Sequence, residues 1–398
     1  MESFTFLTTP VIQQNATEAG LAQSVIEQLI TLAQRITNEP ALRECVGQLF
    51  AQTYERAVIT IDPTPETLFG AEVNLLYLLL ALDSVRRLRA SQQQRGIPAA
   101  ITGEISRSLA TAVRRFAEFH AGKAGLEDWV LRYWFGSTAA SGDLYRLGRL
   151  EFILQPFEGN LRVYRHKQSG QVQVLAEEGV HLTADGYLHF TIGEAAYAHY
   201  GWRKTEEAED GWTATLVEDD TSITGTPISP LGYALRTPLQ LAKDEWELRL
   251  CNGDTVLDMH IPNFMPLRLD LLHASLQRAM DFFPRYHPDR PFKAFVCDSW
   301  LFDTQFVEML PVSSNILAFQ RQGYLFPCLS GGVDGMYFIF GDWLVDLDKA
   351  PQDTALRRAI VNHMRLGGKL RSGGFLLLPE DVVKFGQEPY RNDEWMLP

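Results

Sequence analysis

The residues of this chain that are best suited to chemistry stand near the ends of two predicted strands. One strand alternates apolar and polar residues and carries Asp258 and His260 on the same face. The other, Phe292–Leu301, is almost wholly apolar until Asp298 and Ser299 interrupt it, as expected for a central strand covered on both faces. Imidazole, carboxyl and hydroxyl groups are side chains that acid–base chemistry uses.

The segment between these strands predicts how the polar residues come together. Pro262 ends the first strand, because proline has no N–H for a ladder. Leu269–Phe283 then repeats apolar residues at helical spacing. Strand, helix and strand in this order form a crossover unit with parallel strands, and ligands bind beyond the carboxyl ends of such strands. We therefore expect His260, Asp298 and Ser299 to border one crevice beside a helix N-terminus that is compatible with phosphate.

Glycine-containing pairs predict two further turns. Asn252-Gly253 is typical of a two-residue turn, so we expect a hairpin between Trp246–Leu250 and Thr255–Ile261. Near the end of the sequence, Gly367-Gly368 and Gly373-Gly374 are interpreted as turns around a final hairpin.

Apolar periodicity predicts a helical N-terminal domain. Apolar residues recur at helical spacing in Leu21–Ile36 and in Glu66–Arg89. A third helix, expected near residues 104–121, has an apolar face. Its opposite face carries Arg107, Arg114 and Arg115, which we interpret as solvated.

The period changes after Thr138–Gly142, where we place the domain boundary. Alternating, strand-like residues follow. The prediction is a helical domain over residues 1–140, then an α+β or α/β domain with a mixed sheet over residues 141–398. We interpret an acidic stretch near residues 193–244 as a solvent-exposed insertion in this domain.

Composition limits the partners. The 398 residues include 36 Lys and Arg against 49 Asp and Glu, a net charge of −13. Such a chain lacks the basic surface that nucleic acid or anionic lipid requires. The apolar run Leu75–Leu82 is far shorter than the roughly 20 residues that cross a bilayer. The N-terminal residues do not have the pattern of a secretory signal, and the four cysteines are scattered. We expect a cytoplasmic protein with no metal, no nucleic acid and no membrane partner.

Several short stretches between Leu144 and Leu378 occur in an informative order. They are LGRLEF at 147–152, ITGTPISP at 223–230, NGDTVLDMHIP at 252–262, FVCDSWLF at 295–302, SNILAF at 314–319, DTALRR at 353–358, and the glycine pairs at 367–368 and 373–374. Together they resemble the two-domain GNAT-like acyltransferases, which have a helical N-acyltransferase N-terminal domain and a GNAT-like C-terminal domain. The resemblance implies transfer of an acyl group from acyl-CoA, or from an acyl carrier protein, to an amine.

The turn after the first strand departs from the family pattern. In the family, a small turn that contains glycine follows the strand that ends His-Ile-Pro, whereas here the turn is Asn263–Pro266. The glycine-rich pyrophosphate loop of typical GNAT enzymes is also missing, although glycine lets backbone amides approach phosphate oxygens. We interpret the bulky pair Phe264-Met265 as lining an acyl or pantetheine channel, with the phosphates held elsewhere. The alternative is that CoA is not the donor.

The resemblance and the residue types together suggest roles. His260 is the predicted general base, since an ordinary imidazole titrates near neutral pH, and its alternative is a local backbone contact. Ser299 is predicted to protonate the leaving thiolate or to bind the carbonyl oxygen, and Asp298 to face the substrate or complete a hydrogen-bond network. Asp258 is predicted to orient the imidazole or attract a cationic acceptor, with a salt bridge as the alternative, and Trp300 to contact substrate.

The predicted donor-binding residues surround the same turn and one later helix. They are Ile261, Pro262, Asn263, Phe264, Met265, Arg268, Ser314 and Asn315. Ser314 and Asn315 have helix capping as their alternative role.

The predicted function is N-acylation by direct attack of an amine on a thioester in a ternary complex, without an acyl-enzyme. The acceptor is a small-molecule amine or, alternatively, a peptide side chain that receives a fatty acyl group. A third alternative is a GNAT-shaped binding or scaffold protein without catalysis, which the missing glycine turn motivates.

Overall fold

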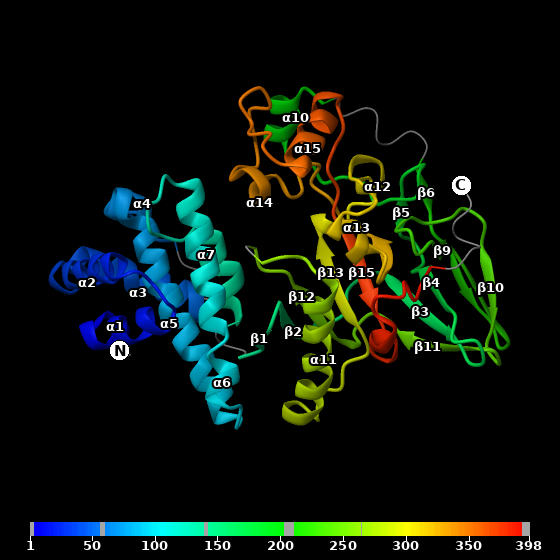
Figure 1. The fold of residues 1–398 in the computed structure, drawn as a ribbon, viewed down its shortest axis with the longest axis horizontal. Helices are drawn as coiled ribbons and strands as arrows, with labels where there is room; N and C mark the ends of the chain where they lie inside the picture. Colours follow the sequence, from blue (N-terminus) through cyan, green and yellow to red (C-terminus); the bar gives the residue numbers. More distant parts are fainter. Residues whose placement is uncertain (1–3, 56–59, 139–141, 203–210, 264, 392–398) are drawn as a thin grey trace. The chain divides into compact units, whose positions relative to one another are not determined.

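The computed structural model describes residues 4–55, 60–138, 142–202, 211–263 and 265–391. The chain divides into two compact units (Figure 1). The first consists of Met1–Ile153, His260–Pro266 and Phe282–Tyr286, and the second consists of Leu154–Met259, Leu267–Asp281 and His287–Pro398.

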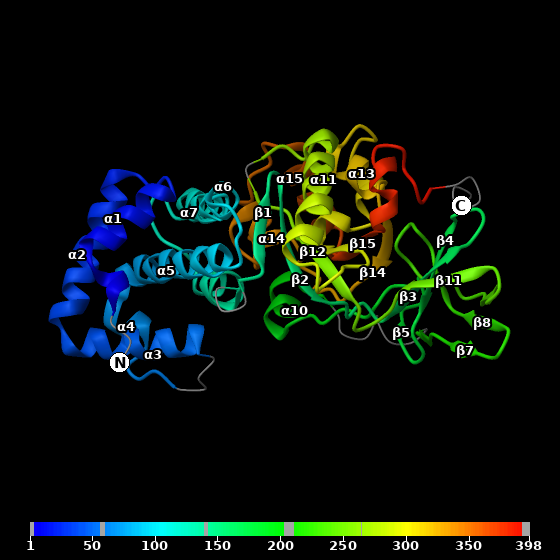
Figure 2. The ribbon, with the colours of Figure 1, turned by 90° about the horizontal axis from the view of Figure 1, so that it is seen from below.

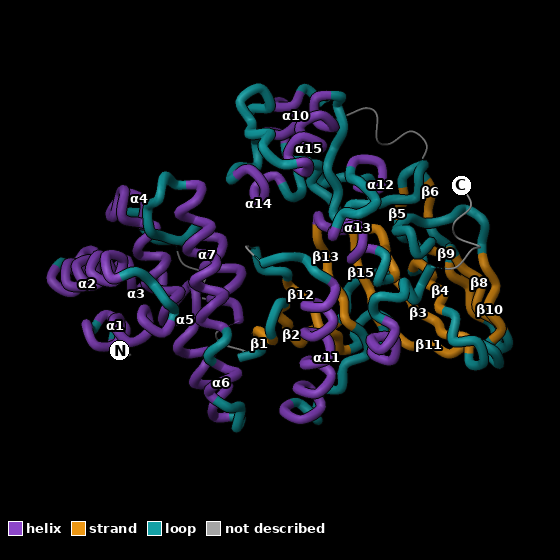
Figure 3. Tube along the Cα trace, viewed as in Figure 1, coloured by secondary structure: helices purple, strands orange, loops and turns teal. Residues whose placement is uncertain are grey.

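Helices dominate the first unit (Figure 3). These helices form because their sequences carry apolar stripes: residues such as Leu29, Leu32 and Ile36 recur on one face, and that face is buried. The α-helices are α1 (Thr9–Glu18), α2 (Gln23–Asn38), α3 (Pro40–Tyr54), α4 (Pro65–Phe69), α5 (Val73–Gln94), α6 (Ala99–Thr102), α7 (Ile105–Phe119) and α8 (Asp128–Val130). The shorter helical turns are η1 (Thr5–Leu7), η2 (Gly70–Glu72) and the π-helical η3 (Leu131–Gly136).

Helix α5 is the core of the helical unit. Every residue from Leu75 to Val85 is buried. By length and composition alone, the helical stretch Pro65–Gln94 is long and apolar enough to cross a membrane, but 67% of its most apolar window is buried inside the protein. A core helix of a globular domain passes the same test, so this stretch is weak evidence for a membrane span.

A tight hairpin completes the first unit after the helices. Strand β1 (Leu144–Leu147) pairs antiparallel with β2 (Leu150–Pro156), whose last residues continue into the second unit. The two-residue turn is Gly148-Arg149, and Gly148 has φ +82°, a conformation that glycine adopts without steric cost.

In the second unit, two parallel strands carry most of the predicted chemistry. Strand β12 (Thr255–His260) pairs parallel with β13 (Phe295–Ser299), and α11 (Leu269–Tyr286) connects them along the chain, as predicted. The register joins Leu257 to Phe295 and Asp258 to Val296. Strand β15 (Gly373–Leu377) pairs antiparallel with β13, and β14 (Tyr324–Pro327) pairs antiparallel with β15. This is the predicted mixed sheet.

Smaller antiparallel sheets form the rest of the β-structure (Figure 2). Their orders are β11-β3-β4-β9, β10-β8-β7 and β5-β6. The strands are β3 (Leu161–His166), β4 (Val172–Ala176), β5 (His181–Leu182), β6 (Trp212–Thr213), β7 (Leu216–Glu218), β8 (Ser222–Gly225), β9 (Pro227–Ile228), β10 (Leu239–Ala242) and β11 (Trp246–Leu250). Part of the predicted acidic insertion, residues 203–210, lies outside the described residues.

Short helices follow the strands of the second unit. Several of them share a separate apolar core that includes Met336, Ile339 and Ile360. The helices are α10 (Glu194–Tyr200), η5 (Trp300–Phe302), α12 (Phe306–Met309), α13 (Asn315–Gln320), α14 (Met336–Phe340), α15 (Ala355–Arg365) and η6 (Pro379–Lys384).

The hairpin predicted around Asn252-Gly253 is wrong in its pairing. A turn forms there, with Gly253 at φ +87°. However, β11 pairs with β3 while β12 pairs with β13, so the two flanking strands belong to different sheets. A turn signal is local, whereas the pairing partner of a strand depends on segments far away in the sequence.

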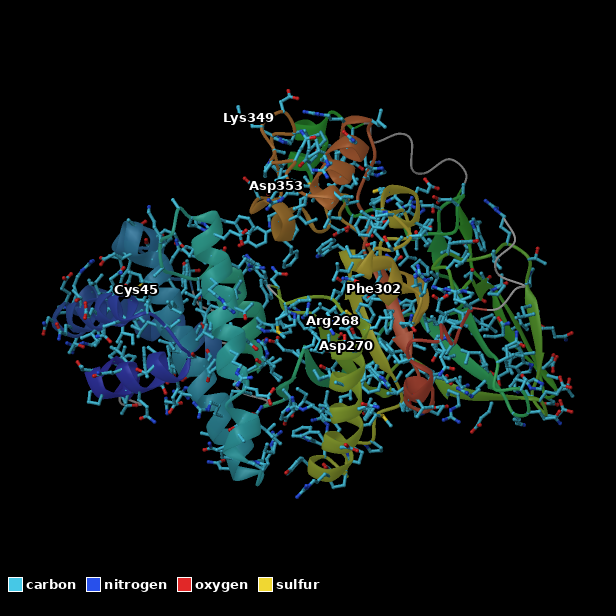
Figure 4. All side chains as sticks on the ribbon, viewed as in Figure 1. Cys45, Arg268, Asp270, Phe302, Lys349 and Asp353 are labelled. Atoms are coloured by element: carbon cyan, nitrogen blue, oxygen red, sulfur yellow. The ribbon has the colours of Figure 1, made fainter. Side chains whose placement is uncertain are left out.

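The turn predicted at Gly373-Gly374 is also wrong, because both residues lie inside β15. A Cβ atom at Gly373 would lie 2.2 Å from the carbonyl oxygen of Phe302, the residue labelled in Figure 4. A Cβ atom at Gly374 would lie 2.2 Å from the ring of Phe326. The two glycines are therefore needed for close packing rather than for a turn.

We expect Gly373→Ala to lower the free energy of unfolding by about 1–3 kcal/mol, because the added methyl group overpacks against backbone. The measurement is chemical denaturation. Gly193→Ala is the matched control, since Gly193 has φ −71° and no atom within 4 Å of an added Cβ. The control should change the same free energy by less than about 0.5 kcal/mol. Equal stability of the two variants would contradict the packing argument.

Candidate functional site

Two carboxyl groups stand at the carboxyl ends of β12 and β13. The register between these strands reaches Asp258 and Val296, and β13 then runs on to Ser299. Asp298 follows Val296 by two residues, so it points to the same face of the sheet as Asp258. The ends of the two strands therefore present two carboxyls on one face: Asp258 is the last residue of β12 paired with β13, and Asp298 lies two residues beyond its partner Val296.

Burial raises the pKa of both carboxyl groups, and the charge of Asp298 adds to the rise at Asp258. Asp258 is partly buried, and desolvation together with the charge of Asp298 raises its pKa to about 7. Asp298 keeps an exposed face, but the surrounding protein removes part of its water shell and raises its pKa. The thiol of Cys328 lies 2.7 Å from Oδ1 of Asp298. A carboxyl with a pKa near neutral pH is suited to accept a proton in catalysis.

Ser299 and Trp300 follow Asp298 in the second unit. The Ser299 hydroxyl accepts a hydrogen bond from the Leu301 N–H at 3.2 Å, which caps the 3₁₀ turn η5. The Trp300 ring lies 2.7 Å from the position that a Cβ on Gly335 would take, so glycine is required there. Cys297 is buried in the core, and this burial together with the two nearby aspartates raises the pKa of its thiol.

His260, the predicted base, belongs to the first unit. Its ring centroid is 4.2 Å from that of Trp134. Desolvation, followed by the charges of Arg115, Arg149 and Arg146, lowers its pKa to about 3. The imidazole is therefore neutral at neutral pH, but it is a weak base. Its role in catalysis stays a prediction.

The turn after His260 contacts two arginines of the β1–β2 hairpin. Arg149 Nε donates to the Pro266 carbonyl at 3.1 Å, and Arg149 Nη2 donates to the Met265 carbonyl at 3.2 Å. Arg146 Nη2 lies 3.2 Å from the Met265 sulfur.

The other turn residues predicted to bind the donor differ in burial. Ile261 and Asn263 are partly buried and Pro262 is buried. Phe264 lies outside the described residues. The donor-binding role of these residues stays a prediction.

The remaining predicted donor-binding residues have local partners. Arg268 forms an ion pair of 2.6 Å with Asp270 at the start of α11, and both are labelled in Figure 4. Ser314 Oγ accepts the Ile316 N–H at 3.2 Å, and Asn315 is the first residue of α13. Ser314 therefore caps α13, which is the alternative role predicted for it, and Asn315 begins the same helix. The donor-binding role of Arg268, Ser314 and Asn315 stays a prediction.

Buried arginines of the first unit were not predicted from the sequence pattern. Arg115 was predicted on a solvated helix face, but it is only 7% exposed, and its guanidinium lies 5.3 Å from the Trp129 ring centroid. Arg146 and Arg149 come from the hairpin and are 5% and 4% exposed. Helical spacing does point Arg107 and Arg114 to solvent. Arg115 differs because it lies beside the buried stripe and packs on an aromatic ring. The LGRLEF stretch contains Arg149 and directly follows Arg146, so it was the available signal for these two arginines.

Within the described residues, no group of three or more His, Cys, Asp or Glu side chains is arranged to hold a metal ion.

Known protein families account for most of the chain. Residues 12–136 match the N-acyltransferase N-terminal domain, and residues 144–376 match the GNAT-like C-terminal domain. The second match alone covers more than half of the sequence. The chain therefore belongs to the two-domain GNAT-like N-acyltransferase family, and the predicted resemblance is confirmed. No curated protein matches this sequence.

Three solved acyltransferase structures have a similar fold. One, in complex with decanoyl-CoA and teicoplanin, has a TM-score of 0.60 at 19% identity and covers 93% of this chain and 88% of that chain. A mutant acyltransferase in complex with octanoyl-CoA has a TM-score of 0.59 at 19% identity, with 92% and 87% covered. A third, with CoA and 10C-teicoplanin, has a TM-score of 0.53 at 18% identity, with 92% and 99% covered.

The raised pKa of Asp258 predicts a pH dependence of stability. An unfolded aspartate titrates near 3.9, whereas folded Asp258 titrates near 7, so between these values the folded state binds more protons. Its contribution to stability is fully present below about pH 4 and is lost as the pH rises through about 7. We expect Asp258→Asn to flatten the fall in unfolding free energy between these values.

Denaturation at several pH values tests this expectation. Asp270→Asn is the control, because exposed Asp270 pairs with Arg268, which lowers its pKa and keeps it ionised over this range. The control should keep the wild-type slope. If Asp258→Asn also keeps that slope, the raised pKa is refuted.

Proposed function

We propose that this protein transfers an acyl group from acyl-CoA to an amine by direct attack in a ternary complex. The amine nitrogen forms a bond to the thioester carbonyl carbon, the C–S bond breaks, and CoA leaves as its thiol. The attacking nitrogen loses one proton and the sulfur gains one, so no acyl-enzyme and no redox partner are needed.

The observation that supports this proposal most directly is the pair of carboxyls, Asp258 and Asp298, at the place where the pairing of β12 with β13 ends. Ligands of sheets with parallel strands bind beyond the carboxyl ends of those strands. Asp258 stands at that place with a pKa of about 7, so at neutral pH it is partly ionised and can accept the proton of the amine. Desolvation is the main cause of this raised pKa, and the charge of Asp298 adds to it. Both carboxyls attract an acceptor that arrives as an ammonium ion.

We assign the base to Asp258 rather than to His260, the base first predicted. A general base works best when its pKa lies near the working pH. The imidazole has a pKa of about 3, so it would accept the amine proton less favourably than the carboxylate does. Its neutral ring remains available to donate or accept a hydrogen bond.

The solved neighbours support the choice of donor and acceptor. Acyltransferases of similar fold were solved with octanoyl-CoA or decanoyl-CoA, and one holds decanoyl-CoA together with teicoplanin. We therefore propose acyl-CoA with a medium-length chain as the donor and an amine on a small molecule or peptide as the acceptor.

The pH profile of kcat/KM tests the assignment of the base. With decanoyl-CoA and a primary amine, kcat/KM should rise with pH and level off above about 7, as Asp258 loses its proton. Asp258→Asn should lower it by about 10²–10⁴-fold and abolish the rise. Asp298→Asn should shift the rise to lower pH, because the repelling charge is gone. The readout is release of the CoA thiol.

His260→Gln completes the comparison. If Asp258→Asn keeps the wild-type kcat/KM while His260→Gln loses it, the base is His260 and our assignment is wrong.

Donor binding is a separate expectation. Decanoyl-CoA at about 100 times its Kd should stabilise the protein by about 2.7 kcal/mol, measured as a rise in Tm. Asp258→Asn should show the same rise, since the proposed base does not hold the donor. If no acyl-CoA of any chain length shifts the Tm of the wild-type protein, the scaffold alternative replaces the enzyme.

A further inference from the structure

The thiol of Cys328 contacts the carboxyl of Asp298 in the second unit. Its Sγ lies 2.7 Å from Oδ1 of Asp298. Cys328 directly follows β14, whereas Asp298 belongs to β13, and β15 lies between these two strands in the sheet. The contact therefore joins two segments that meet only because the sheet brings them together.

The register of the three strands explains how the thiol comes near the carboxyl. Gly374 of β15 pairs with Asp298 on one side and with Phe326 on the other, so these three positions face the same side of the sheet. Because Gly374 has no side chain, β15 places no group between the outer strands in this row. The Phe326 ring packs against the glycine, where a Cβ would lie 2.2 Å from it. Cys328, two residues later, brings its thiol to Asp298.

The thiol is the donor in this contact. Cys328 is 9% exposed. Burial, followed by the charge of Asp298, holds the pKa of the thiol well above its usual range, and Cys297 and Asp334 are further titratable groups that raise it. The sulfur therefore keeps its proton at neutral pH. Since the thiolate is the reactive form of cysteine, Cys328 is suited to donate a hydrogen bond and not to accept the acyl group.

We propose that Cys328 is a positioning residue for the reaction: its thiol holds the carboxylate of Asp298 in place at the carboxyl end of β13. This role rests on the proposed function, in which Asp298 attracts an acceptor that arrives as an ammonium ion. A hydrogen bond to the charged form of a carboxyl also favours that form. The Cys328 thiol lowers the pKa of Asp298 in this way, against the larger effect of burial. One thiol thus fixes both the direction and the charge of the carboxylate that meets the amine.

Steady-state kinetics with decanoyl-CoA and a primary amine test this role, at a pH above the rise of kcat/KM. Cys328→Ala should raise the KM of the amine about three- to tenfold, because one hydrogen bond to the carboxylate is lost. It should leave kcat nearly unchanged, because the base Asp258 is intact. Cys328→Ser keeps a donor and should keep the wild-type KM. Asp298→Asn should also raise the KM, and adding Cys328→Ala to it should change nothing further.

Cys297→Ala is the matched control. Cys297 is also a buried thiol, next to Asp298 in the sequence, but neighbouring residues of a strand point to opposite faces of the sheet. The control therefore removes a core thiol without removing the donor, and it should keep the wild-type KM of the amine.

NMR of isotopically labelled aspartate carboxyls tests the hydrogen bond without turnover. Cys328→Ala should raise the pKa of the Asp298 carboxyl, since the donor that favours its charged form is gone. Cys328→Ser should leave that pKa close to the wild-type value. Cys328→Val fills the space of the thiol without a donor, so it gives the same test if the alanine variant folds poorly.

Two outcomes would overturn this role. If the alanine and valine variants keep both the amine KM and the titration of Asp298, Cys328 only fills space. If Cys328→Ala raises the KM further in the Asp298→Asn background, the thiol acts through another group. Failure of the proposed function looks different, since the wild type would then acylate no amine while the NMR titration would still respond to Cys328→Ala.

Discussion

The candidate site depends on the parallel pairing of β12 with β13. Parallel strands end at the same edge of a sheet, so residues from two distant segments arrive there together. The register reaches Asp258 and Val296 and leaves Asp298 beyond it on the same face. Because like charges in partly desolvated surroundings oppose each other's ionisation, this pairing moves a carboxyl into the range where it can exchange protons at neutral pH. Neighbouring β15 contributes through glycine, which lets the sheet pack closely against Phe302 and Phe326.

Burial shifts the titrating groups of the two units in opposite directions for the same reason. Low polarity disfavours any charged form, so the pKa of Asp258 rises while those of His260 and Arg149 fall. Within each unit, the neighbouring like charges reinforce the effect. A carboxyl that can take a proton near neutral pH is what acyl transfer from a thioester to an amine would use. This agreement of site chemistry with family membership supports an enzyme rather than a scaffold.

Much of the fold was predictable because the pattern of apolar residues is local and strong. Helical periodicity located the helices of the N-terminal part, and the long apolar run at Phe292–Leu301 indicated a central strand parallel to the one before it. Wrong predictions arose where the same local signal fits two tertiary arrangements. Asn252-Gly253 forms a turn, but its strands enter different sheets, and Gly373-Gly374 is inside a strand because neighbouring groups leave no room for a Cβ. Arg115 follows a polar pattern yet is buried against Trp129.

By itself, the sequence determined which segments are helices or strands, which family the chain belongs to, and that Asp258, His260, Asp298 and Ser299 stand near strand ends. These properties follow from side-chain size, polarity and spacing along the chain. Only the tertiary structure decided which of these groups titrates near neutral pH and that arginines surround the imidazole. Desolvation and charge interactions depend on atoms that are distant in sequence and close in space, and no local pattern records them.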